Sequence, residues 1–235
     1  MAPVLREFPG PWALAEALAV AVADALRAGI RDRGRATLVL SGGTTPRRFL
    51  EALSTQVLEW RAVTITLADE RWVAPDHARS NERLVRDNLL HGAASAAIFV
   101  PLFTPDASDP ESGIVEIATK FAAALPLPFD VVVLGMGGDG HCASLFPGGD
   151  NLAAAMRADG KDLVLPMRAP AAEEPRITLT LTALTRTRAM YLHIEGTDKK
   201  HVLEQALAGT APFEQAPTAA VLAHSAATPQ VFYCP

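Results

Sequence analysis

The chain has 235 residues, of which 49% are hydrophobic and 20% are charged, and 21 Lys and Arg against 26 Asp and Glu give a net charge of −5. This length suits one large α/β domain, and the composition is that of a folded globular protein rather than of a disordered chain. The negative surface offers no general electrostatic reason to bind nucleic acid or anionic membranes. An anionic ligand therefore requires a local basic pocket.

Two further features bear on location. Cys142 and Cys234 are the only cysteines, which is too few for a disulfide framework and fits a reducing compartment. The apolar stretch 12–26 is interrupted by Glu16 and Asp24, and neither a basic start nor a cleavage site frames it. We therefore predict a core-packing helix here, no membrane span, and a cytoplasmic protein.

Short runs rich in β-branched residues alternate with helical patterns along the chain. This alternation predicts an α/β fold with a mostly parallel, Rossmann-like sheet flanked by helices on both faces, in a single domain over residues 1–235. The expected strands cover residues 37–40, 63–67, 97–102, 130–134, 177–181 and 190–194.

Three of the expected helices have recognisable starts, at Pro46, at Ser80 or Asn81, and at Asp198. Proline fits the first turn of a helix, where its missing N–H costs nothing. Ser, Asn and Asp side chains accept hydrogen bonds from the free backbone N–H groups of a helix start, so these residues are candidate N-caps.

Ligands of open α/β sheets bind beyond the carboxyl ends of the strands, so the residues that follow each strand are the informative ones. Three predicted strands end in unusual segments: Ser-Gly-Gly-Thr-Thr-Pro at 41–46, Asp-Glu-Arg at 69–71, and Gly-Met-Gly-Gly-Asp-Gly-His at 135–141. We expect these segments to form one site.

The first segment contains Gly42, Gly43 and Thr44. Its glycines allow the backbone to approach a ligand, its threonine hydroxyl donates a hydrogen bond, and the helix start supplies free N–H groups, all of which suit a phosphate. A plain strand-to-helix turn explains the same residues, because this motif alone is weak.

The second segment places Asp69, Glu70 and Arg71 directly after an apolar strand, and we expect all three to face the crevice or its rim. A surface salt bridge is the alternative. The third segment is more specific. His141 follows a turn with four glycines and Asp139, whose carboxylate can hold the imidazole in one tautomer and orientation.

The glycines Gly135, Gly137 and Gly140 also satisfy the dinucleotide fingerprint G-x-G-x-x-G. A Rossmann helix should continue from the third glycine, yet Pro147 interrupts the chain shortly after it. Zinc-ligand spacings and the G-x-S-x-G elbow are also missing. We therefore expect no cofactor and no metal, and we interpret Cys142 as a packed residue rather than a nucleophile.

Together these segments resemble the 6-phosphogluconolactonase family. The most specific match is the string GMGGDGHCASLFP at 135–147, and segments 41–46, 69–73 with 80–81, 175–180 and 196–199 follow the family's order. The resemblance implies a fold shared with glucosamine-6-phosphate deaminases. It also implies hydrolysis of 6-phospho-D-glucono-1,5-lactone in the oxidative pentose phosphate pathway, with this phosphorylated sugar lactone as the ligand. The oligomeric state stays open.

With this activity in mind, we assign hypothetical roles to the candidate residues. His141 activates a water and later returns the proton to the leaving ring oxygen, Arg71 stabilises the oxyanion, and Asp69 and Asp139 orient these two groups. The phosphate is expected among Gly42, Gly43, Thr44, Lys199 and Arg176.

Two alternatives are kept. Deaminases of this superfamily typically follow the histidine with Phe-Asn-Glu-Pro, whose glutamate supports their ring-opening histidine, whereas this chain has Ser144-Leu145-Phe146-Pro147 without an acid. A sugar-phosphate isomerase or deaminase is therefore the second choice. A non-enzymatic sugar-phosphate sensor is the third, although the segment before the first predicted core strand leaves little room for a helix-turn-helix reader.

Overall fold

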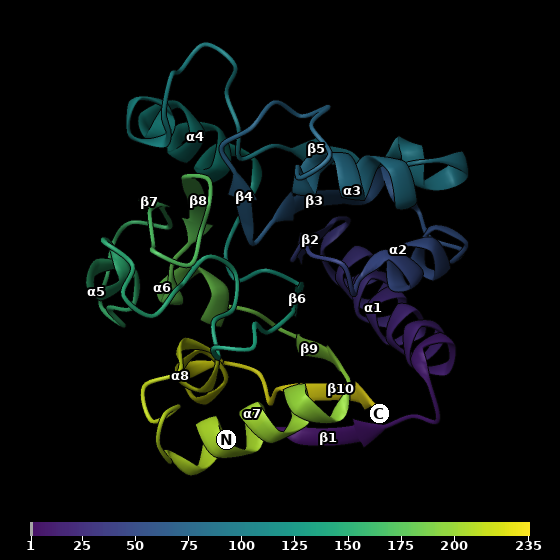
Figure 1. The fold of residues 1–235 in the computed structure, drawn as a ribbon. Coiled ribbons are helices and arrows are strands. Elements are labelled where there is room, and N and C mark those ends of the chain that lie inside the picture. Colours follow the sequence, from purple (N-terminus) through teal and green to yellow (C-terminus); the bar gives the residue numbers. More distant parts are fainter. Residues whose placement is uncertain (1) are drawn as a thin grey trace.

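A seven-stranded sheet runs through the centre of the computed structural model, which describes residues 2–235 (Figure 1). The strand order is β1-β10-β9-β6-β2-β3-β5, and every neighbouring pair is parallel. This arrangement confirms the predicted Rossmann-like sheet. Its strands are β1 (Val4–Glu7), β2 (Ala36–Leu40), β3 (Val63–Leu67), β5 (Ile98–Val100), β6 (Val131–Leu134), β9 (Met190–Glu195) and β10 (Gln230–Cys234).

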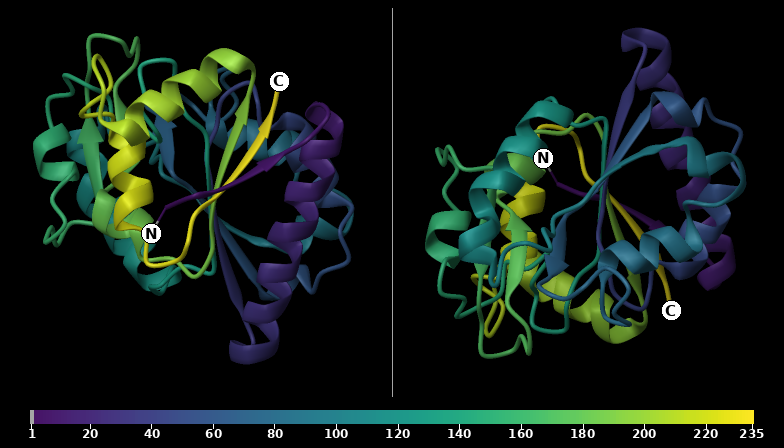
Figure 2. Two further views of the ribbon diagram at one scale, coloured as in Figure 1. Left: turned by 90° about the horizontal axis from the view of Figure 1, so that it is seen from below. Right: turned by 90° about the horizontal axis from the view of Figure 1, so that it is seen from above.

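Helices cover both faces of this sheet, as predicted. The helix α1 (Pro11–Arg33) lies on one face with α2 (Arg47–Ser54), and α2 in turn contacts α3 (Asn81–Asn88). Figure 2 shows α1 on one side of the strands and α8 (Pro217–His224) on the other. The remaining helices are α4 (Pro110–Ala124), α5 (Leu152–Ala155), α6 (Leu181–Thr185) and α7 (Thr197–Ala208), with short 3₁₀ turns η1 (Trp60–Ala62) and η2 (Gly92–Ala96).

A second, three-stranded antiparallel sheet lies beside the main one and has the order β4-β8-β7. It consists of β4 (Asp69–Arg71), β7 (Val164–Met167) and β8 (Arg176–Leu179). The run predicted at 177–181 therefore does not join the parallel sheet. Only residues 168–175 connect β7 to β8, which is too short for the crossover that parallel neighbours need.

The central strands β2 and β6 are neighbours, but the chain leaves them toward opposite faces. From β2 it enters α2 on the face of α1, and from β6 it runs to the small sheet, against which α4 also packs. Between the two strand ends the backbone opens into the type of crevice where ligands of such sheets bind.

One of the three predicted helix starts is correct in detail, because the Ser80 hydroxyl caps α3 by accepting a hydrogen bond from the backbone N–H of Arg83. The helix α2 begins at Arg47, so Pro46 occupies its N-cap position and not the predicted first turn. The prediction for Asp198 is wrong, because α7 begins at Thr197 and Gly196 occupies the N-cap position. Gly196 has φ 91°, a value that favours glycine and lets the chain turn sharply from β9 into the helix.

The buried apolar side chains form one cluster that extends from α1 through the main sheet to the small sheet, which supports a single folded unit. At the amino ends of the central strands, this core is closed by the buried carboxylate of Asp130. Asp130 accepts hydrogen bonds from the backbone N–H and hydroxyl of Thr37 at 2.8 and 3.1 Å and from Arg33 at 2.5 Å. One carboxylate therefore links α1, β2 and the start of β6.

We expect Asp130→Ala to lower the free energy of unfolding by about 2 to 4 kcal/mol, because it leaves the buried backbone N–H of Thr37 without a hydrogen-bond acceptor. Urea denaturation checks this value. The matched control is Asp159→Ala, which removes a carboxylate whose partner Arg157 is also exposed, and which should leave the unfolding midpoint unchanged. Equal losses in the two variants would contradict the role assigned to Asp130.

Candidate active site

A pocket of about 360 Å³ opens at the carboxyl ends of β2 and β6. The three unusual segments of the sequence meet there, as expected. Of the nine predicted site residues, Asp139 does not line the pocket and lies behind the ring of His141. The other eight contribute to its wall: Gly42, Gly43, Thr44, Asp69, Arg71, His141, Arg176 and Lys199.

The imidazole of His141 is fixed by two neighbours. Its Nδ1 lies 2.5 Å from Oδ1 of Asp139, and its ring packs on Phe146 with 4.3 Å between centroids. A carboxylate can only accept hydrogen bonds, so Nδ1 is the donor, and in the neutral imidazole Nε2 then has the free lone pair. Burial alone would raise the pKa of Asp139, but the hydrogen bond and charge of His141 outweigh it and hold that pKa below its usual range.

Glycine is required in the turn that carries this histidine. A Cβ on Gly137 would lie 2.2 Å from Nδ1 and Cε1 of His141, and Gly140 has φ 81°. The turn closes through a 2.8 Å hydrogen bond from the N–H of Gly137 to the carbonyl of His141. No helix continues from Gly140 in the described chain, where the next helix is α5, so this turn lacks the geometry of a dinucleotide site.

Asp69 and Arg176 form a buried pair at the pocket wall. The Asp69 carboxylate accepts a 2.6 Å hydrogen bond from the hydroxyl of Ser144 and lies 3.8 Å from the Arg176 guanidinium, which covers the ring of Phe146. Burial lowers the pKa of Arg176, and the charge of Asp69 opposes this effect. The ion-pair partner of Asp69 is thus Arg176, whereas the expected role of Asp69 in orienting Arg71 stays a prediction.

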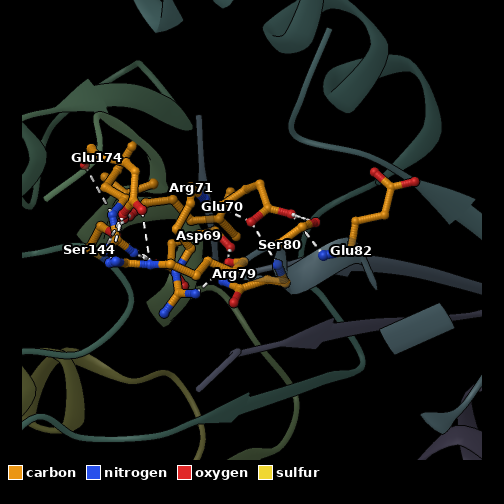
Figure 3. Close-up of polar contacts among 12 residues, drawn as sticks. Asp69, Glu70, Arg71, Arg79, Ser80, Glu82, Ser144 and Glu174 are labelled. Atoms are coloured by element: carbon orange, nitrogen blue, oxygen red, sulfur yellow. Dashed lines mark hydrogen bonds and ion pairs between the residues drawn. The ribbon is translucent and has the colours of Figure 1, made fainter. Parts of the chain in front are cut away.

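Asp69 and Glu70 point in opposite directions although they are adjacent in the sequence (Figure 3). Asp69 reaches toward Ser144, whereas Glu70 reaches toward Ser80 and the start of α3. The prediction that the whole Asp-Glu-Arg segment faces the crevice is therefore wrong for Glu70. The segment is itself the strand β4, and successive side chains of a strand alternate between its two sides.

Arg71 lies at the pocket wall, where its guanidinium donates a 2.5 Å hydrogen bond to the carbonyl of Arg79. Its Nε is buried without a hydrogen-bond partner. The donor capacity of this guanidinium is therefore only partly used by the protein. A ligand oxygen in the pocket is the kind of acceptor that the remaining N–H groups require.

Lys199 reaches the pocket from the first turn of α7. Its ammonium donates a 2.8 Å hydrogen bond to the carbonyl of Met136, next to the histidine turn. Burial lowers the pKa of Lys199, and the charge of Asp139 opposes this effect. The adjacent Lys200 points elsewhere, with its ammonium 3.4 Å from Glu7 and 4.7 Å from the ring centroid of Tyr233.

The sequence did not reveal three residues of the pocket wall. Asn81 donates a hydrogen bond of 2.9 Å from its side chain to the carbonyl of Asp69. His193 is buried, and its Nε2 lies 3.1 Å from Oε1 of Glu195. His193 and Glu195 both belong to β9, where polar residues two positions apart fit the ordinary alternation of side chains along a strand. No sequence signal therefore marked them. Asn81 appeared as a candidate helix cap and within the family motif, without a role in the site.

Cys142 is a packed side chain, as expected, and burial raises the pKa of its thiol to about 12. Within residues 2–235, no three side chains of His, Cys, Asp or Glu lie close enough together to hold a metal ion. The same residues contain no helix that is both long and apolar enough to cross a membrane.

A doubly wound α/β sheet whose carboxyl edge combines a His–Asp pair with several cationic side chains defines an enzyme-like fold suited to an anionic substrate. The chain belongs to the glucosamine-6-phosphate isomerase/6-phosphogluconolactonase family, whose model matches residues 9–230. This result confirms the resemblance carried by the sequence motifs.

Several members of this family are similar to the chain in sequence or in structure. A 6-phosphogluconolactonase from Rhizobium meliloti is 46% identical over 97% of each chain. A crystal structure of a 6-phosphogluconolactonase from Shewanella baltica is 40% identical and superimposes with a TM-score of 0.93, covering 99% of this chain and 98% of that one. A monomeric glucosamine-6-phosphate deaminase shares the fold with a TM-score of 0.75, at 18% identity over 98% and 97% of the two chains.

We expect Gly137→Ala to displace the imidazole, because the added methyl group would overlap with the ring of His141 and approach Asp139 to 2.6 Å. The ring ¹⁵N chemical shifts of His141, which depend on tautomer and hydrogen bonding, should then change. Gly138→Ala is the control, since the atom nearest to its Cβ is the ammonium of Lys199 at 3.9 Å. Identical spectra for the two variants would contradict this packing argument.

Proposed function

We propose that this chain hydrolyses 6-phospho-D-glucono-1,5-lactone to 6-phosphogluconate, a step of the oxidative pentose phosphate pathway, as a carboxylic ester hydrolase. The Nδ1 to Oδ1 contact between His141 and Asp139 carries the proposal, because in a neutral imidazole it assigns the proton to Nδ1 and makes Nε2 the nitrogen that can accept one. The names of the relatives support the same reaction. The two cysteines, both buried and unpaired, support a cytoplasmic location.

The proposed reaction begins with a water held by Nε2 of His141. As the water oxygen attacks the lactone carbonyl carbon, Nε2 takes its proton, and Asp139 stabilises the imidazolium that forms. Arg71 offers N–H groups to the carbonyl oxygen as negative charge develops on it. The tetrahedral intermediate then breaks the bond to the ring oxygen, which receives the proton from His141 and becomes a hydroxyl group.

The phosphate is assigned to a second set of groups in the same pocket. The segment from Gly42 to Thr44 supplies backbone N–H groups and a hydroxyl, and Lys199 supplies a positive charge. Arg176 is a further candidate for an anionic group of the ligand, because its buried guanidinium faces the same pocket. These groups provide the local positive charge that a protein of net charge −5 needs to bind an anionic ligand.

The position of Phe146 supports hydrolysis over deamination. Deaminases of the superfamily typically carry a glutamate just before the proline of this string, and here that place is taken by Phe146, whose apolar ring packs on His141. Asp139 is the carboxylate that contacts His141. The similarity to a solved deaminase, at 18% identity, concerns the fold only.

The decisive experiment measures hydrolysis of freshly generated 6-phosphogluconolactone, corrected for spontaneous ring opening. We expect a rate proportional to enzyme concentration. Incubation with glucosamine 6-phosphate is the parallel test, and release of ammonia there without lactone hydrolysis would reject the proposed function. A protein that binds the phosphorylated sugar but turns over neither compound would be a sensor.

We expect His141→Ala to lower kcat by about 10²- to 10⁴-fold while KM changes little, because the base acts in the transition state and the phosphate provides ground-state affinity. His91→Ala serves as the control, since this exposed histidine contacts the carbonyl of Asn88 far from the pocket. Near-normal turnover by His141→Ala would place the base on another residue.

Lys199→Ala should raise KM for the phosphorylated lactone more than about tenfold, through the loss of a charge-assisted hydrogen bond. Lys200→Ala is the internal control, because it removes the same charge one residue further on, where the ammonium faces Glu7. Steady-state kinetics of both variants checks the assignment. If both raise KM equally, the lysines act only through a general positive field.

A further inference from the structure

The carboxylate of Glu70 is buried and accepts four hydrogen bonds, none of which comes from a cationic side chain. Its Oε1 accepts from the backbone N–H groups of Arg71 at 2.7 Å and Asn81 at 2.8 Å. Its Oε2 accepts from the hydroxyl of Ser80 at 3.0 Å and from the N–H of Glu82 at 2.7 Å. Figure 3 shows this carboxylate at the start of α3, on the side of β4 away from Asp69.

Both residues held by Oε1 belong to the pocket wall. Arg71 is the residue to which the oxyanion is assigned. Asn81 lies against the segment from Gly42 to Thr44, called the phosphate loop below, so closely that a Cβ on Gly42 would be 1.8 Å from its Oδ1. The side-chain amide of Asn81 also donates a hydrogen bond to the carbonyl of Asp69. A single oxygen atom thus fixes the backbone of two segments that meet the substrate from different elements, β4 and α3.

We propose that Glu70 is a positioning residue for the reaction: its ionised carboxylate holds Arg71 and Asn81 in register, and through Asn81 also the phosphate loop at Gly42. This inference rests on the proposed lactone hydrolysis. Glu70 does not line the pocket, so it acts on the substrate only through these neighbours.

The negative charge of Glu70 is part of the arrangement. All four partners are donors, so a proton on either oxygen would face an N–H or O–H group and displace it. The charged groups around Glu70 are Asp69 and Arg71 on β4, Glu82 on α3 and Arg176 opposite Arg71 on β8, and none of them forms an ion pair with it among residues 2–235. Only N–H and O–H dipoles compensate the buried charge.

Burial raises the pKa of Glu70 to about 7 against the lowering effect of the N–H groups of Asn81, Glu82 and Arg71, and the charge of Asp69 adds to the rise. As the pH falls through this value, Glu70 gains a proton, and the four hydrogen bonds that its carboxylate accepts are weakened. The ionised carboxylate is therefore the form present above about pH 7, well above the range in which an exposed glutamate ionises. Activity that depends on these four hydrogen bonds is therefore lost as the pH falls.

The test compares Glu70→Gln with Glu82→Gln. Both substitutions keep the side-chain shape and remove one buried negative charge near the start of α3. The carboxylate of Glu82, however, accepts a hydrogen bond from Arg86, which like Glu82 does not line the pocket. At pH 8.5 we expect Glu70→Gln to lower kcat/KM for 6-phosphogluconolactone at least tenfold, and Glu82→Gln to change it less than twofold. Similar losses in both variants, or none in Glu70→Gln, would overturn the proposal.

The acid limb of the pH profile is a second readout that a purely structural role would not move. In wild type, protonation of Glu70 should contribute to the fall of log(kcat/KM) toward acid. Glu70→Gln removes this contribution, so its acid limb should be less steep than that of wild type. An unchanged limb in a variant with reduced kcat/KM would assign Glu70 to stability alone.

Ser80→Ala keeps the test decisive if Glu70→Gln does not fold. It removes one of the four donors and leaves the carboxylate in place. We expect kcat/KM to fall threefold or more, and a value within 1.5-fold of wild type would overturn the proposal. Absence of lactone hydrolysis by the wild-type protein would refute the proposed function itself. The comparisons between variants and wild type test only the role of Glu70, so the two outcomes are distinguishable.

Discussion

The pocket depends on one constraint, which is that β2 and β6 lie side by side while the chain leaves their carboxyl ends toward opposite faces of the sheet. A hydrogen bond of 3.0 Å from the N–H of Ser41 to the carbonyl of Val133 holds the two strand ends together. Beyond it, the glycine-rich segments diverge and their backbone groups face a shared opening. Residues from distant parts of the sequence reach that opening only because the parallel sheet aligns all its carboxyl ends.

Much of the fold could be predicted from the sequence because its parallel strands are buried and rich in β-branched residues. Four strands escaped prediction. One of them, β10, is buried and does carry this signal, but the other three lack it for identifiable reasons. All four residues of β1 are exposed, so no burial pattern marks it. The three residues of β4 are Asp, Glu and Arg, and they form a strand because β8 supplies the opposite half of the ladder. The strand β7 contains Pro166, which weakens any prediction of a strand.

In the candidate site, the sequence predicted which residues take part better than it predicted where their side chains point. The glycine turn determines the place of His141, because only glycine at position 137 leaves room for its ring. The side of a three-residue strand on which each acid lies depends instead on where that strand begins, which the motif does not reveal. The partners of Asp69 and Glu70 therefore emerged only from the structure, as did the pair of His193 and Glu195 on β9.

The pairing of β1 with β10 has a practical consequence for handling the protein. The two strands run parallel, with Val4 opposite Gln230, and Cys234 at the end of β10 lies opposite Glu195 at the pocket. The start of β1 therefore lies at the amino end of the sheet, and the end of β10 lies at its carboxyl end, next to Glu195 of the pocket wall. Figure 1 shows the C-terminus directly after β10. A purification tag or surface anchor attached before β1 leaves the substrate entrance facing solution, whereas one attached after β10 crowds it.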